Sequence, residues 1–170
     1  MQVIWQTFPS GVSVQYNARM AIGVISDTHG LLRPEAMEAL GGSELILHAG
    51  DLGSAEVLRA LERFAPVVAV RGNVDLEAWA ERLHPVEVAE FAEKTFYLLH
   101  RIADLDLNPE AAGIAAVIYG HSHQPLIEWR DGVLFFNPGS AGPRRFSLPV
   151  TVGRIEIVDG ELRPEIIQLL

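Results

Sequence analysis

The first half of the chain alternates short apolar runs with segments in which apolar residues recur every three or four positions. Short apolar runs bounded by turn residues predict buried strands at 22–25, 45–47 and 67–70. Helical spacing predicts helices at 34–40, 54–64 and 75–82. Pro34 suits the first turn of one helix, and Ser54 suits the N-cap of the next. Strand–helix units in this order favour a parallel or mixed sheet with helices on its faces.

Strand-like segments dominate the second half. They lie at 86–91, 95–99, 115–119, 126–130, 133–136, 150–158 and 162–169. Asp131-Gly132 and Asp159-Gly160 separate the last two pairs of segments and are strong hairpin signals. We therefore expect an α/β (α+β) fold in which two mixed β-sheets pack face to face as a sandwich, with helices outside.

The chain of 170 residues has the length of one ordinary domain. Residues 1–19 stand apart, because they are mixed in character and Met20 opens directly onto an apolar run. We interpret 1–19 as an N-terminal extension of uncertain structure, with a turn at Pro9-Ser10-Gly11, in preference to an integral first hairpin. Residues 20–170 are then the functional domain.

Composition excludes several classes of protein. With 49% apolar and 21% charged residues, the chain is globular in composition. The absence of cysteine excludes zinc fingers, iron–sulfur clusters and thiol nucleophiles. The one lysine, Lys94, follows Glu93 instead of the glycine of a Walker-type phosphate loop. The net charge of -9 argues against nucleic acid as a partner. Because the N-terminus lacks a basic segment leading into an apolar run, we expect a cytoplasmic protein with no membrane partner.

Five loops that follow apolar strands carry residues of the kind that ligate metals. The loops are Ser26-Asp27-Thr28-His29, Ala49-Gly50-Asp51-Leu52-Gly53, Gly72-Asn73-Val74-Asp75, His100 and Gly120-His121-Ser122-His123. Residues two apart in extended chain face the same side, so Asp27 and His29 can converge on one site. The same holds for His121 and His123. Carboxylate oxygen together with imidazole nitrogen suits manganese, iron, zinc, cobalt or nickel better than calcium.

The order of these motifs resembles that of the calcineurin-like metallophosphoesterases. It reads D-x-H, G-D-x-G, G-N-x-D, H and G-H-x-H, and the likeness runs from about Met20 to near the C-terminus. The short chain and the segment Asn137-Pro138-Gly139-Ser140 resemble the small YfcE-like bacterial and archaeal branch. Each motif alone is common, but in this order and after apolar strands the set is highly specific.

The resemblance implies a pair of divalent metal ions, with manganese the first expectation and iron, zinc, nickel or cobalt the alternatives. It assigns one ion to Asp27, His29 and His123. It assigns the other to Asn73, His100 and His121, with Asp51 as the bridge. Catalytic roles fall to Asp51, Asn73 and His100. Such a centre implies a phosphoesterase, in the first place a phosphodiesterase, in which a metal-activated hydroxide attacks the phosphorus of a small phosphate ester.

Two positions depart from the family pattern. Many members have histidine after the asparagine of G-N-x-D, where it is thought to protonate the leaving group, and this chain has Val74. The small branch often lacks that histidine too. His100 is followed by Arg101 where glycine is usual. The alternative function is a protein-binding scaffold such as the retromer subunit Vps29, which resembles this fold. A nuclease is disfavoured by the charge, and a homo-oligomer is left open.

Several further residues have a structural interpretation beside a functional one. His48 is expected to be a buried or supporting histidine and His84 a surface residue. Asp75 is expected to cap the helix that follows it. Three arginines are equally consistent with a phosphate contact and with plain surface positions: Arg71, Arg144 and Arg145.

Overall fold

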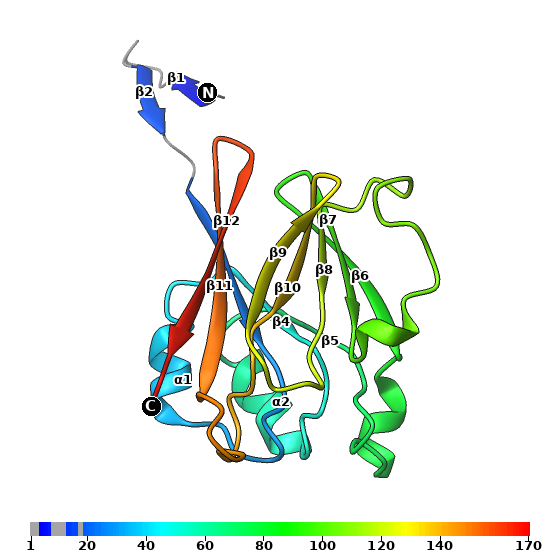
Figure 1. The fold of residues 1–170 in the computed structure, drawn as a ribbon. Helices are drawn as coiled ribbons and strands as arrows, with labels where there is room; N and C mark the ends of the chain where they lie inside the picture. Colours follow the sequence, from blue (N-terminus) through cyan, green and yellow to red (C-terminus); the bar gives the residue numbers. More distant parts are fainter. Residues whose placement is uncertain (1–3, 8–12, 17–18) are drawn as a thin grey trace.

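Two five-stranded β-sheets face each other and make up most of the structure (Figure 1). The computed structural model describes residues 4–7, 13–16 and 19–170. The strands of the first sheet, in spatial order, are β12 (Glu161–Gln168), β11 (Thr151–Val158), β3 (Met20–Ile25), β4 (Leu45–His48) and β5 (Val67–Ala69). Those of the second sheet are β6 (Val86–Phe91), β7 (Lys94–Leu99), β8 (Ala116–Ile118), β10 (Val133–Asn137) and β9 (Leu126–Arg130).

Both sheets are mixed. In the first, β3, β4 and β5 run parallel, while β11 and β12 add antiparallel strands. In the second, β7, β8 and β10 run parallel, with β6 and β9 antiparallel at the two edges. Every strand predicted after residue 20 is present, with bounds shifted by two residues at most. The predicted sandwich of two mixed sheets is therefore confirmed.

Alternate residues of the central strands fill the space between the sheets. Ile22 and Val24 of β3 meet Phe96, Leu98 and other residues of the second sheet in one buried cluster. The intervening residues face outward, as the two-residue period of a strand requires. Ile25 therefore lies in a different cluster from Val24, under the helices.

Most of the helices cover the outer face of the first sheet, and the last of them lies against the outer face of the second. They are α1 (Pro34–Ala39) and α2 (Ala55–Glu62), followed by the 3-10 helices η1 (Ala78–Arg82) and η2 (Ile102–Asp104). Ala36 and Leu61 pack against Ile25 of the sheet. The Ser54 hydroxyl accepts a hydrogen bond from the Val57 N–H, 3.4 Å away, so the predicted N-cap is confirmed. The described residues form no helix long and apolar enough to cross a membrane.

The prediction of a helix at 75–82 is wrong in the type of helix and in its first residue. Only a 3-10 turn forms, from Ala78 to Arg82, and its N-cap is Glu77. Asp75 does not cap it, because the Asp75 carboxylate accepts hydrogen bonds from the backbone N–H groups of Leu52, Gly53 and Gly72 instead. A capping carboxylate accepts hydrogen bonds from only one or two N–H groups at a helix start, whereas here Asp75 accepts from three.

The N-terminal segment contributes a separate pair of strands. β1 (Ile4–Thr7) and β2 (Ser13–Tyr16) pair antiparallel in a two-stranded sheet of their own. The turn predicted at 9–11 lies outside the described residues. Where description resumes, the Arg19 guanidinium pairs with the Glu156 carboxylate of β11.

Glycine at position 153 is required by the packing between the sheets. A Cβ atom on Gly153 of β11 would lie 2.5 Å from two ring carbons of Phe136, which is fully buried on β10. We expect Gly153→Ala to lower the free energy of unfolding by about 1–3 kcal/mol, as overpacking does. In urea unfolding, the double variant with Phe136→Leu should lose at least about 0.5 kcal/mol less than the sum of the two single variants. Strict additivity would show that residue 153 does not press on the ring.

Candidate metal centre

Five loops meet where strands of both sheets end, at one end of the sandwich. Three follow the parallel strands β3, β4 and β5, and two follow β7 and β8 (Figure 1). Backbone hydrogen bonds join them: the Asp27 N–H donates to the Gly50 carbonyl and the His29 N–H to the Asp51 carbonyl, each over 3.0 Å. The Gly120 N–H donates to the His100 carbonyl over 3.0 Å and joins the loops of the second sheet. The loops are thus held together before any side chain contributes.

Most of the predicted ligands adopt a left-handed backbone conformation. The φ angles are +53° at Asp27, +47° at His29, +55° at Asp51, +69° at His121 and +58° at His123. Such a conformation is uncommon outside glycine and costs free energy, so it persists only where surrounding contacts enforce it. Its concentration in these loops marks a site at which the backbone is bent to aim side chains.

Asp27, His29 and His123 bring three ligand atoms together. His123 Nε2 lies 3.1 Å from Asp27 Oδ1 and 3.3 Å from His29 Nε2. Asp27 Oδ2 accepts hydrogen bonds from Ser26 Oγ and the His121 N–H. Asp27 Oδ1 is buried and has no hydrogen-bond partner among the described residues. A carboxylate oxygen that is buried, unpaired and next to two imidazole nitrogens is what a divalent ion requires.

Asn73, His100 and His121 form a second group beside the first. Asn73 Oδ1 lies 3.1 Å from His100 Nε2 and 3.1 Å from His121 Nδ1. His100 Nδ1 lies 2.7 Å from the Ala49 carbonyl, which can only accept, so Nδ1 carries the proton. That bond orients the ring with its Nε2 atom toward the centre, which is the position that a ligating histidine needs.

Asp51 lies between the two groups. Its Oδ2 atom is 3.3 Å from His100 Nε2 and 3.8 Å from His29 Nε2, and its Oδ1 atom accepts from the Val74 N–H over 3.0 Å. Burial raises the pKa of Asp51, but the hydrogen bonds of His100 and Val74 outweigh it, so that the pKa lies below its usual value. The carboxylate is therefore ionised at neutral pH, and its place fits a bridge.

Gly72 lets the third loop approach this carboxylate. A Cβ atom on Gly72 would lie 2.0 Å from Asp51 Oδ1 and 2.1 Å from the Asp51 nitrogen. No side chain fits at that distance. The glycine before Asn73 therefore sets the spacing between Asn73 and Asp51.

Buried polar groups behind the ligands fix the loops. The His48 Nδ1 atom accepts from the Gly50 N–H over 3.2 Å, so its Nε2–H faces Thr28 Oγ1, 3.1 Å away. The Thr28 hydroxyl in turn donates to the Leu52 carbonyl over 3.0 Å. His48 is fully buried, as predicted, and its desolvation lowers its pKa to about 4. The ring stays neutral and joins the first two loops.

Asp75 has a supporting role that the sequence analysis missed. Its buried carboxylate joins the second loop to the third by accepting from Gly53 and Gly72 at 2.8 and 2.9 Å. Its place in the G-N-x-D motif was the available signal, and the capping interpretation concealed it.

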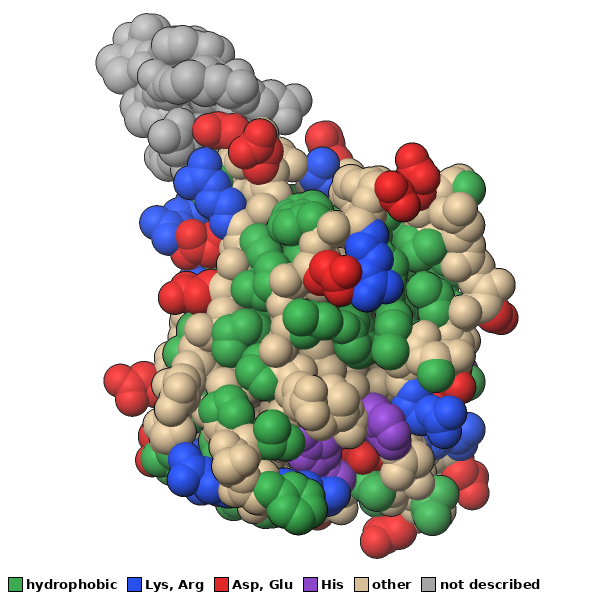
Figure 2. All heavy atoms as spheres, in the orientation of Figure 1, with side chains coloured by type: hydrophobic (Ala, Val, Ile, Leu, Met, Phe, Trp, Pro, Cys, Tyr) green, Lys and Arg blue, Asp and Glu red, His purple; other side chains and the backbone are tan. Residues whose placement is uncertain are grey.

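Of the three arginines left open by the sequence, Arg145 directly contacts a predicted ligand. Its Nη2 atom is 3.3 Å from His29 Nε2. Burial lowers the pKa of His29, and together with Arg145 it outweighs the opposite effect of the Asp51 carboxylate, so the neutral imidazole is favoured. Figure 2 shows histidine side chains reaching the surface at the same end of the molecule, with basic side chains beside them. Arg71 instead lines a small cavity together with Asn73 and His100. His84 is exposed, as predicted, and pairs with Glu87.

Comparison with known proteins by sequence identifies the family. The calcineurin-like phosphoesterase superfamily domain matches residues 20–160. A probable metallophosphoesterase of Methanothermobacter thermautotrophicus is 40% identical in an alignment that covers 88% of this chain and 92% of the relative. The phosphodiesterase YfcE of Escherichia coli is 27% identical in an alignment that covers 81% of this chain and 88% of the relative.

Solved structures share the fold. A structure described as a novel archaeal phosphodiesterase superposes with a TM-score of 0.72 at 28% identity, covering 87% of this chain and 100% of the other. Vacuolar protein sorting 29 of Cryptosporidium parvum superposes with a TM-score of 0.70 at 18% identity, covering 88% of this chain and 97% of the other. The second likeness concerns the fold alone.

Fold, side-chain convergence and relatives together define a metal-dependent phosphoesterase. The chain belongs to the calcineurin-like phosphoesterase superfamily, and YfcE is among its relatives, as the order of the motifs implied.

The buried His48 generates a prediction about acid stability. The unfolded chain protonates this histidine near the ordinary histidine pKa of 6.5, whereas the folded protein does so only near 4. Protons therefore favour the unfolded state between these values, and stability falls as the pH falls. From pH 7 to pH 5 this residue should account for a loss of about 2 kcal/mol. His48→Gln should be less stable than wild type at pH 7, because its hydrogen bonds are less well placed.

The difference in the free energy of unfolding between wild type and His48→Gln should then be about 2 kcal/mol smaller at pH 5 than at pH 7. Urea unfolding at the two pH values measures it. His84→Gln, at an exposed histidine, is the control and should show no such change. A difference that does not depend on pH would mean that His48 titrates normally in the folded protein.

Proposed function

We propose that the protein is a phosphodiesterase that hydrolyses a small phosphate ester with two divalent metal ions, manganese being the expected metal. The observation that carries the proposal is the convergence of seven ligand side chains from five loops, with neighbouring ligand atoms 3.1 to 3.9 Å apart. Asp27, His29 and His123 would hold one ion. Asn73, His100 and His121 would hold the other, and Asp51 would contact both.

The chain's own residues prepare this centre for an anionic substrate. When bound, a pair of divalent ions lowers the pKa of water and neutralises charge on phosphoryl oxygens. Asp27 and Asp51 are the two carboxylates among the proposed ligands, so an occupied centre keeps a net charge of about +2. That charge attracts a phosphate group although the whole chain carries -9. Arg145 adds a guanidinium beside His29 and can reach a phosphoryl oxygen.

Val74 determines which esters suit the enzyme. Its backbone N–H supports Asp51, but its side chain is apolar and 42% exposed. A valine side chain cannot donate a proton to a departing oxygen. General acid catalysis typically contributes about 10²–10⁴-fold, so its absence here favours esters whose leaving groups depart readily as anions.

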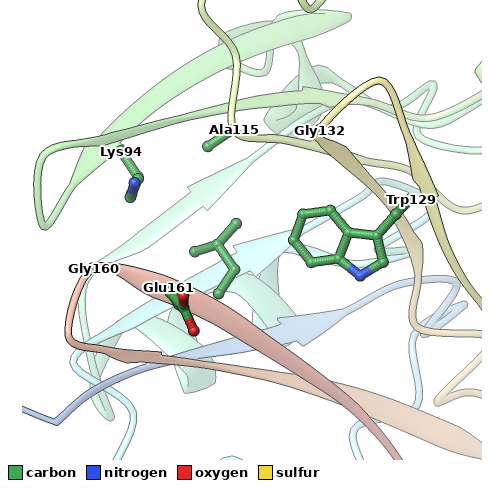
Figure 3. Close-up of a pocket in the computed structure, with 7 residues that line it drawn as sticks. Lys94, Ala115, Trp129, Gly132, Gly160 and Glu161 are labelled. Atoms are coloured by element: carbon green, nitrogen blue, oxygen red, sulfur yellow. The ribbon is translucent and has the colours of Figure 1, made fainter.

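A scaffold function is the second candidate, and a cavity at the other end of the sandwich favours it. The cavity, of about 380 Å³, is lined by hairpin and strand residues that include Lys94, Trp129 and Leu162 (Figure 3). Trp129 is half exposed there. The structurally similar vacuolar sorting protein shows that the fold is not confined to phosphodiesterases. Because all seven ligand residues are present and converge, we favour catalysis.

The first functional prediction concerns metal content. The protein reconstituted with manganese should hold two ions per chain in elemental analysis, and chelation should abolish activity and lower the Tm. Asp51→Asn should lower kcat at least about 100-fold, and more than His29→Ala does, because Asp51 would contact both ions and offset their repulsion. His84→Ala is the matched control, since that histidine lies outside the centre. Finding one ion or none, or two ions and full rate in Asp51→Asn, would overturn the assignment.

The second functional prediction concerns the leaving group. In a series of aryl phosphodiesters at fixed manganese, kcat/KM of the wild type should fall steeply as the pKa of the leaving phenol rises. Val74→His should flatten this dependence by supplying an acid, with the largest gain for the poorest leaving groups. Metal content measured on both proteins controls for damage to the centre. Equal slopes would mean that position 74 does not face the departing oxygen.

A further inference from the structure

The largest cavity described beside the proposed ligands has a definite chemical character. It measures about 650 Å³, within the range of small-molecule sites, and the loop Gly120-His121-Ser122 forms one wall. The lining residues outside that loop include Arg101, Ile102, Tyr119, Leu126 and Arg130. Since His121 contacts Asn73 through Nδ1, the cavity is separated from the second group of ligands by one imidazole ring.

The cavity combines apolar side chains with two cations. Ile102 and Leu126 supply an apolar surface, and Leu126 is 41% exposed, as expected of a side chain that lines an open cavity. Arg101 and Arg130 are the charged residues of its lining. Two guanidinium groups and no carboxylate in the lining favour an anionic occupant, although the chain as a whole carries a net charge of -9.

Each arginine is held in place and still has donors to spare. Arg101 pairs with Asp104 at 3.3 Å, and Arg130 pairs with Glu128 at 2.6 Å while it stacks over the Phe135 ring. A guanidinium has five N–H donors, so one ion pair leaves several unused. Exposed ion pairs contribute little, and an incoming carboxylate or phosphate can replace them at small cost.

Arg101 connects this cavity to the ligands. It directly follows His100 and also lines a smaller cavity, of about 260 Å³, together with Asn73 and His100. The calcineurin-like family usually has glycine at this position, so the cation is a feature of this chain. A side chain that borders both cavities is well placed to select what binds beside the ligands.

We propose that the cavity beside His121 binds the second ester group of the substrate, and that this group is apolar near the phosphorus and ends in an anion that pairs with Arg101 and Arg130. This inference rests on the proposed phosphodiesterase function and adds the substrate class. The apolar part lies against Ile102 and Leu126, and the phosphate lies at the ligands.

Three synthetic diesters with the same 4-nitrophenyl leaving group test the proposal. Their second group is methyl, 4-phenylbutyl or 4-(4-carboxyphenyl)butyl. The methyl ester reports hydrolysis with the cavity empty, the second adds the apolar part, and the third adds the anionic end. We expect kcat/KM to rise in this order, at least tenfold from first to last, with the change mainly in KM.

Variants assign the discrimination to residues. Arg101→Gln should reduce kcat/KM of the carboxylate ester to that of the phenylbutyl ester. The ratio of kcat/KM between the phenylbutyl and methyl esters should stay unchanged. Leu126→Trp, which fills the cavity, should lower kcat/KM of both long esters to that of the methyl ester. Arg59→Gln is the matched control, because Arg59 is exposed and pairs with an acid three residues away, as Arg101 does. Arg59→Gln should leave kcat/KM of all three esters unchanged.

A binding measurement separates the two levels of the proposal. In NMR titrations with 4-(4-carboxyphenyl)butyl methyl phosphate, which lacks a good leaving group, the methyl signals of Ile102 and Leu126 should shift in wild type and far less in Arg101→Gln. Shifts without hydrolysis of any ester would support the cavity and refute the phosphodiesterase function. Hydrolysis of all three esters at equal kcat/KM, without shifts, would refute the cavity alone. Equal effects of Arg59→Gln and Arg101→Gln on kcat/KM would also overturn the assignment of the cavity.

Discussion

Two carboxylates, Asp27 and Asp51, are almost completely buried at one end of the sandwich, and their desolvation is the cost that the surrounding structure must offset. Each uses one oxygen for protein donors and turns the other toward imidazole nitrogens: Asp27 accepts from Ser26 and His121, and Asp51 from Val74. The loops are arranged around this requirement. Moving any one of them would leave a buried charge unpaired, which costs far more than a lost surface contact.

The two sheets bring those loops to one place by strand direction. β3, β4 and β5 are parallel and end together, and β7 and β8 end at the same side of the facing sheet (Figure 1). The tightly packed space between the sheets fixes their separation, because it is filled by side chains such as Phe96 and Phe136. The positions of the proposed ligands therefore depend on a core that contains none of them.

Much of this arrangement was predictable from the sequence, because it depends on patterns of one or two residues. Apolar runs identified every strand after residue 20, and the loops after them contained the converging side chains. The left-handed conformation of Asp27 or His29 was not predictable, since it is imposed by contacts between loops. Asp75 was assigned to a helix cap because its true partners, at Leu52 and Gly53, are distant in sequence. The approach of Arg145 to His29 likewise depends on how two loops fold over each other.

The five proposed ligands with positive φ also affect how such a protein can evolve. At each of these positions glycine, which adopts that conformation freely, would release about 1 kcal/mol of backbone strain while removing a proposed ligand. A lineage freed from selection for catalysis would thus find stabilising substitutions first among its own ligands. Loss of the metal centre then increases the stability of the fold. The sandwich that remains can be selected for its ability to bind other molecules.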